Sequence, residues 1–119
     1  MAIGTAGDRT DEILHNLGRL AGELADEVVI CEKRHYLRGR ELEAMNAIMR
    51  EGIAESGYKG AVDAFPTELA ALEGLASRAR RGDVVAVMSH VERTEIFTWL
   101  EGAGFKPVRI DRLRKLLGA

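Results

Sequence analysis

Hydrophobic and polar positions along this chain follow two alternating patterns. In residues 10–25 the apolar side chains recur at helical spacing, which predicts an amphipathic helix capped by Thr10 or Asp8. Residues 28–31 are continuously apolar, which is typical of a strand buried on both faces of a parallel sheet. The patterns then predict further helices at residues 41–56, 66–82, 91–102 and 111–117, and further strands at residues 1–3, 61–65, 84–88 and 105–110.

The order of these elements predicts an α/β fold. Strands that alternate with helices form βαβ units, in which the strands run parallel and helices cover both faces of the sheet. We therefore expect a three-layer Rossmann-like domain with a mostly parallel sheet flanked by helices. The 119 residues, 46% of them hydrophobic, suffice for one domain and are too few for two.

Two local features refine this expectation. Gly18 and Gly22 lie one turn apart and form a small-residue strip, which should let the first helix approach the sheet closely. Pro107 has no N–H group, so the last strand is expected at an edge of the sheet.

Charge and cysteine content narrow the classes of function. The net charge of -2 provides no overall field to attract nucleic acid or an acidic membrane. Cys31 is the single cysteine, so an intrachain disulfide and a cysteine-based metal cluster are excluded. No carboxylates stand at metal-binding spacing, so we expect no metal site made by this chain alone. With no membrane-spanning or secretory pattern, we expect a cytoplasmic protein.

Cationic residues gather in the loops that should follow the strands. Ligands of open parallel sheets bind beyond the carboxyl ends of the strands, and guanidinium groups bind carboxylates and phosphates through paired hydrogen bonds. An anionic small molecule is therefore the expected ligand, although any single arginine could instead pair with Asp8, Glu32 or Glu41. The cationic loop residues are Arg9, Lys33, Arg34, His35, Arg38, Arg40 and His90.

Other candidates carry weaker signals. Gly4 and Gly7 permit a tight turn close to a ligand, but neither a full GxGxxG nor a Walker phosphate loop occurs, so this chain is not expected to hold and cleave ATP. Cys31 suits a core position better than a nucleophile. The apolar group around Phe97 and Trp99 is either core or a patch for a partner, and core is favoured.

In combination, several of these elements resemble the C-terminal domain of the Mur ligase family, most closely the carboxy-terminal part of cyanophycin synthetase-like ligases. The resemblance covers residues 4–89, and past Ser89 only the fold is similar. Its motifs are Gly7-Asp8-Arg9-Thr10-Asp11-Glu12, Leu17-Gly18-Arg19, Val28-Val29-Ile30, Leu37-Arg38-Gly39-Arg40 and Arg50-Glu51-Gly52.

The resemblance implies part of an ATP-dependent amide-bond ligase that joins an acid to an amino acid. In that family a central domain holds ATP with Mg²⁺, and the C-terminal domain closes over it and helps to bind the incoming amino acid and the nucleotide. Matching the motifs residue by residue, Arg9 would bind a substrate carboxylate, and Arg34, Arg38 and Arg40 would form a second substrate-binding loop. The resemblance also implies nucleotide-binding roles for Gly7, Asp8, Ser89 and His90.

The chain also departs from the family pattern. Relative to that pattern, we expect this chain to lack the N-terminal and central ATP-binding domains and to carry a first strand cut to residues 1–3. We therefore expect no catalysis by this chain alone and a central ATP-binding domain as partner. On the side of the first strand we expect apolar surface or an open sheet edge that could pair with a second copy. The alternative is a stand-alone α/β module that binds a small molecule or forms a homodimer.

Overall fold

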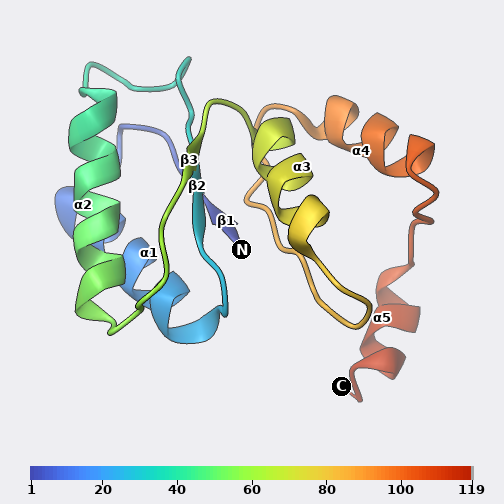
Figure 1. Ribbon diagram of the computed structural model, residues 1–119. Coiled ribbons are helices and arrows are strands. Elements are labelled where there is room, and N and C mark those ends of the chain that lie inside the picture. Colours follow the sequence, from blue (N-terminus) through green and yellow to red (C-terminus); the bar gives the residue numbers. More distant parts are fainter. Residues whose placement is uncertain (119) are drawn as a thin grey trace.

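The computed structural model describes residues 1–118 and has a mixed α/β architecture (Figure 1). A small parallel sheet lies between helices, and within the described residues there are three strands and five helices. The strands are β1 (Ala2–Ile3), β2 (Val29–Cys31) and β3 (Ala64–Phe65). The helices are α1 (Asp11–Leu24), α2 (Leu42–Glu55), α3 (Glu68–Arg78), α4 (Arg93–Gly102) and α5 (Ile110–Leu116).

The strands pair in the order β1-β2-β3, all parallel. Ala2 is in register with Val29, and Ile30 with Ala64. On its other side, β1 lies beside residues 84–88, where a single bridge joins Ala2 to Val87. The first strand is therefore interior, and our expectation of an open edge beside it is wrong.

Two expected strands do not form as such. Residues 84–88 contribute only the one bridge to β1, and Val84 is 90% exposed rather than buried. Residues 105–109 form no strand, and α5 begins directly after them. An apolar run predicts a strand only where a neighbour is available to pair with it, and the outer side of residues 84–88 has no such neighbour among residues 1–118.

Alternate residues of the strands pack into two separate apolar clusters. Ile3 and Ile30 contact α1 and α2 on one face, where Leu14, Met49 and Ile53 are buried. On the other face, the buried strand residues Ala2, Val29 and Cys31 pack against Ala71 and Leu75 of α3. The continuous apolar run of β2 is thus explained by burial on both faces.

The helix boundaries follow from recognisable end signals. The Thr10 hydroxyl accepts a hydrogen bond from the Ile13 N–H group at 3.2 Å and caps α1, which confirms one of the two expected caps. The Thr67 hydroxyl caps α3 in the same way. Gly57 follows the end of α2 with φ of 88°, a conformation that favours glycine.

The glycine strip on α1 faces a helix rather than the sheet. A Cβ atom on Gly18 would lie 2.1 Å from the main-chain oxygen of Met49 in α2, and one on Gly52 would lie 2.0 Å from that of His15 in α1. Our expectation that the strip serves an approach to the sheet is wrong, because α1 and α2 lie side by side on one face and use these glycines for close contact (Figure 1).

The substitution Gly18→Ala should therefore destabilise the fold. Overpacking of a closely packed contact typically costs about 1–3 kcal/mol, more than the helix propensity that alanine adds. Gly102→Ala is the matched control, because nothing lies within 4 Å of a Cβ atom at that helical position. Urea unfolding followed by circular dichroism should show a loss for Gly18→Ala alone; equal stability of the two variants would contradict the packing.

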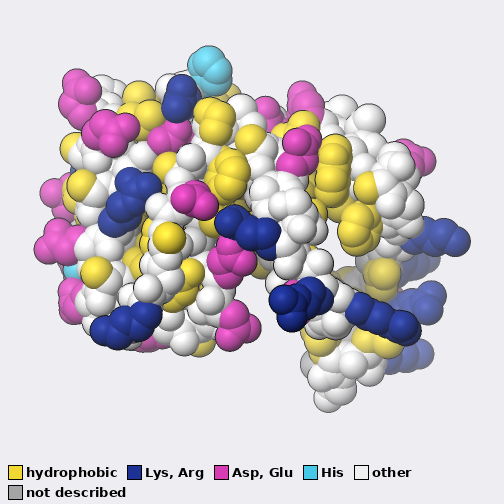
Figure 2. Space-filling view, in the orientation of Figure 1, with side chains coloured by type: hydrophobic (Ala, Val, Ile, Leu, Met, Phe, Trp, Pro, Cys, Tyr) yellow, Lys and Arg dark blue, Asp and Glu magenta, His cyan; other side chains and the backbone are white. Residues whose placement is uncertain are grey.

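The C-terminal part of the chain is the most exposed. Phe97 is 65% exposed and α4 buries only Ile96, so the expectation of an apolar core around Phe97 and Trp99 is wrong for Phe97. α5 confirms the helix expected at residues 111–117 but has no buried residue. Lys and Arg side chains gather at the lower right of the molecule, over the end that carries α5 (Figure 2). None of the helices in residues 1–118 has the length and apolar character to cross a membrane.

Candidate functional site

Three loops meet at the carboxyl ends of the strands. The Gly7 N–H group, in the loop after β1, donates to the Tyr36 carbonyl oxygen at 2.8 Å, in the loop after β2. Arg40 donates to the Arg9 carbonyl oxygen at 3.3 Å and joins the same two loops. Lys33 donates to the Met88 carbonyl oxygen at 2.7 Å and ties the second loop to the turn after residues 84–88. The expected functional edge is thus a set of contacting loops.

The glycines of the first loop provide close packing between main chains. A Cβ atom on Gly7 would lie 1.7 Å from the Leu37 carbonyl oxygen, and one on Gly4 would lie 2.1 Å from that of Cys31. Because the Gly7 N–H group already bonds to Tyr36, its part in the site is to hold the two loops together.

The cationic side chains of this edge differ in their partners. Arg34 donates to the Glu32 carboxylate at 2.8 and 3.0 Å, and Arg40 forms an ion pair with Asp11. The Arg38 guanidinium lies 5.5 Å from the centre of the Tyr36 ring. The backbone of Arg38 has a positive φ of 52°.

Arg9 and Asp8 are both exposed. Among the residues that the structure describes, neither side chain has a hydrogen bond or an ion pair. Arg38 also has no carboxylate partner in residues 1–118, so these loops carry two exposed guanidinium groups, those of Arg9 and Arg38, and one exposed carboxylate, that of Asp8.

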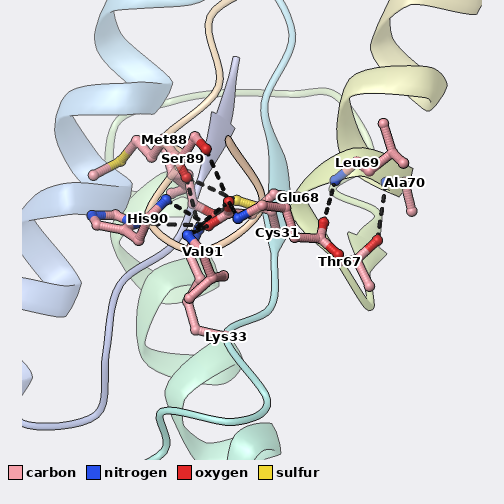
Figure 3. A network of polar contacts seen from close by, with 12 residues as sticks. Cys31, Lys33, Thr67, Glu68, Leu69, Ala70, Met88, Ser89, His90 and Val91 are labelled. Atoms are coloured by element: carbon pink, nitrogen blue, oxygen red, sulfur yellow. Dashed lines mark hydrogen bonds and ion pairs between the residues drawn. The ribbon is translucent and has the colours of Figure 1, made fainter. Parts of the chain in front are cut away.

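The turn that contains Ser89 and His90 is held by an internal carboxylate, that of Glu68 at the start of α3 (Figure 3). The Ser89 hydroxyl donates to Glu68 at 3.0 Å, and the N–H groups of His90, Val91 and Glu92 donate at 2.8, 3.1 and 2.9 Å. These donors are satisfied within the protein. The His90 imidazole is half-exposed and remains beside the edge.

Glu68 also forms a buried ion pair with Lys33, and the two side chains are 1% and 2% exposed. Burial of the Glu68 carboxylate opposes its charged form, but the hydrogen bond from Lys33 and those from the N–H groups of His90, Glu92 and Val91 outweigh it. Together these effects lower the pKa of Glu68 from its ordinary value of 4.5 to about 2. The carboxylate therefore stays charged and holds α3, the loop after β2 and the turn together.

A second buried polar contact lies beside the first. Asn46 of α2 donates to the Glu32 carboxylate at 2.7 Å, and both residues are buried. The side chains of Asn46 and Arg34 together fix the orientation of the Glu32 carboxylate, directly after β2. The amide oxygen of Asn46 has no hydrogen-bond partner among the described residues.

Sequence reasoning missed these buried groups. The sequence predicts Lys33 only as one of the cationic loop residues and indicates no role for Glu68. A usable signal was the position of Lys33 two residues after a doubly buried strand, where a charged side chain needs a counter-charge. The partner, however, lies 35 positions away.

Cys31 occupies the core, as expected. Its side chain is fully buried, with the sulfur 3.5 Å from the Ile3 carbonyl oxygen, and burial raises the pKa of the thiol. Within residues 1–118, no group of three or more His, Cys, Asp or Glu residues is arranged to hold a metal ion. Comparisons of the chain with protein-family models, with curated proteins and with solved structures found no match.

Proposed function

We propose that this chain is a three-layer Rossmann-like C-terminal domain of an ATP-dependent acid–amino-acid ligase of the Mur type. Its role is to help bind the incoming amino acid and the nucleotide, with catalysis completed by a central ATP-binding domain. The observation that carries the proposal is the contact between the Gly7-Asp8-Arg9 loop and the Leu37-Arg38-Gly39-Arg40 loop: the Arg40 side chain donates to the Arg9 carbonyl oxygen, and the Gly7 N–H group donates to Tyr36, directly before Leu37.

The geometry of the edge supports a ligand with a carboxylate or phosphate group. The Arg9 and Arg38 side chains are exposed there, without a carboxylate partner among the described residues. An arginine side chain binds both kinds of anion through two parallel hydrogen bonds. The Glu68 carboxylate and Lys33 hold the third loop against the second. The main chain of the loop that carries Arg38 is therefore anchored.

The residues present fit part of the nucleotide only. Exposed guanidinium groups suit its phosphates, whereas no group of three or more His, Cys, Asp or Glu residues in residues 1–118 is arranged to hold Mg²⁺. In the proposed ligase, Mg²⁺ and the bulk of ATP are therefore held by the central domain. ATP there would activate a carboxylate for attack by an amino group.

The substitution Arg9→Ala should weaken binding of an amino acid or of ADP to this chain by about tenfold, the typical effect of losing one charge-assisted hydrogen bond. Arg112→Ala is the matched control, because Arg112 is an exposed arginine on α5, outside the edge. Titration calorimetry with ADP, L-aspartate and L-arginine measures both. Equal affinities of the two variants for every ligand would count against the proposal.

One observation favours the alternative, a stand-alone interaction module. A hollow of about 760 Å³ lies between α3, residues 84–88 and α4; apolar side chains line much of it, together with three arginines and with Ser89 of the turn at the cationic edge. Sedimentation at increasing concentration separates the two functions, since a homodimerising module should associate and a ligase domain that awaits a different partner should stay monomeric.

A further inference from the structure

The α5 helix carries a stripe of apolar side chains that stays exposed. Residues three, four or seven positions apart share one face of a helix, and this spacing brings four apolar side chains of α5 and its C-cap to one side. The stripe consists of Ile110, Leu113, Leu116 and Leu117. α5 buries no side chain, and Leu116 and Leu117 are 69% and 72% exposed. Such a stripe normally faces a core, so its exposure indicates a surface that binds something.

Arginine side chains border the stripe on both sides. Arg112 lies one helical turn from Leu116 on one side, since the two residues are four positions apart. Arg114 lies one turn from both Ile110 and Leu117 on the other side. The apolar stripe therefore has a cationic border along its length.

The charge around the stripe is strongly positive, although the net charge of the whole chain is -2. Residues 105–118 contain five Lys and Arg side chains and a single acidic one, that of Asp111. No ion pair within residues 1–118 involves any of the five. Lys and Arg side chains also gather over this end of the molecule in Figure 2. The partner that complements this surface is anionic. The five residues are Lys106, Arg109, Arg112, Arg114 and Lys115.

The combination of an apolar stripe with a cationic border matches the surface of an anionic bilayer. There, apolar side chains enter the boundary between headgroups and acyl chains, while Lys and Arg side chains reach back to the headgroups. A nucleic acid would use the cations but leave the stripe in water, and α5 has no aromatic side chain on which a base could stack. The lipid surface is the one partner that uses both parts of α5.

We propose that α5 is a peripheral membrane-binding helix, which lies in the surface of a bilayer that contains anionic lipids. Figure 1 shows α5 at an outer corner of the molecule, set apart from the sheet, so a flat surface reaches it without displacing another element. The association is reversible, because a helix of seven residues buries far less apolar surface than one that spans the bilayer.

Sedimentation of the full chain with lipid vesicles tests the partner. Binding to vesicles of equal parts phosphatidylcholine and phosphatidylserine should be at least about tenfold tighter than binding to phosphatidylcholine alone, because each cation near an anionic surface contributes several-fold. Added salt should weaken this binding. Equal binding to the two kinds of vesicle, or none to the anionic ones, would overturn the proposal.

Substitutions separate the role of the stripe from that of the charge. Leu117→Gln should weaken binding to the anionic vesicles by about tenfold, and Arg114→Gln by about fivefold. The matched controls are Leu24→Gln and Arg81→Gln, which remove an exposed leucine and an exposed arginine outside α5 and should bind like the wild type. All four side chains are exposed, so circular dichroism should show the fold unchanged.

Two results of this series would contradict a membrane role. If Leu117→Gln bound the vesicles as tightly as Leu24→Gln, the apolar stripe would not enter the bilayer. If duplex DNA bound the chain as tightly as the anionic vesicles did, and equally in Leu117→Gln, the partner of the cations would be a nucleic acid. Either result would overturn the proposal.

Discussion

The substitution Glu68→Gln should lower the free energy of unfolding by about 3–5 kcal/mol, the typical effect of removing one partner of a buried ion pair. The Lys33 ammonium would be left buried without a counter-charge, and the N–H groups of His90, Val91 and Glu92 would lose a charged acceptor. Urea unfolding followed by circular dichroism measures the change.

Glu73→Gln is the control for this prediction, because Glu73 lies on the same helix and is exposed. It should change stability by less than about 0.5 kcal/mol. A double-mutant cycle with Lys33→Met then isolates the pair. If Glu68→Gln behaved like Glu73→Gln, the Glu68 carboxylate would not hold the turn as described.

The second large effect is a loss of stability in acid. The pKa of Glu68 is lowered from 4.5 to about 2 in the folded protein, so the folded state favours the charged carboxylate. Its contribution is fully present above pH 4.5 and is lost as the pH falls towards 2, a change of about 3 kcal/mol. Urea midpoints between pH 6 and pH 2 should show this decline in the wild type.

The same series in Glu68→Gln provides the comparison. That variant has no ionisable group at position 68, so its stability should fall less over this range, and the gap between the two proteins should narrow as the pH is lowered. If the difference in free energy of unfolding between the two proteins were the same at every pH, Glu68 would not be the group whose protonation causes the loss of stability.

The elements that the sequence predicts well are those with local causes. The helical spacing in α1 and the Thr10 cap identify that helix, and the continuous apolar run identifies β2, because burial on both faces requires it. Residues 84–88 have an equally apolar pattern, but whether such a segment forms a paired strand depends on neighbours that are far away in the sequence.

The candidate site also has one part that the sequence predicts and one part that it does not. Topology alone predicts that the loops after β1 and β2 lie at one edge, and the Gly7 contact with Tyr36 agrees with that. The ion pair between Lys33 and Glu68 depends on tertiary packing across 35 positions. Glu68 directly follows the Thr67 cap, where an acidic residue is common for its interaction with the helix dipole, so its burial has no local signature.

The central proposal is that the cationic edge binds an anionic ligand, and nuclear magnetic resonance of the isotopically labelled chain tests it most directly. On addition of millimolar ADP or amino acid, we expect the amide signals of Arg9, Arg38 and His90 to shift together and to saturate. Signals from α5 should stay in place, since that helix lies outside the edge. If no signal near Arg9, Arg38 or His90 moved with any of these ligands, the proposal that this edge is a binding site in the isolated chain would be contradicted.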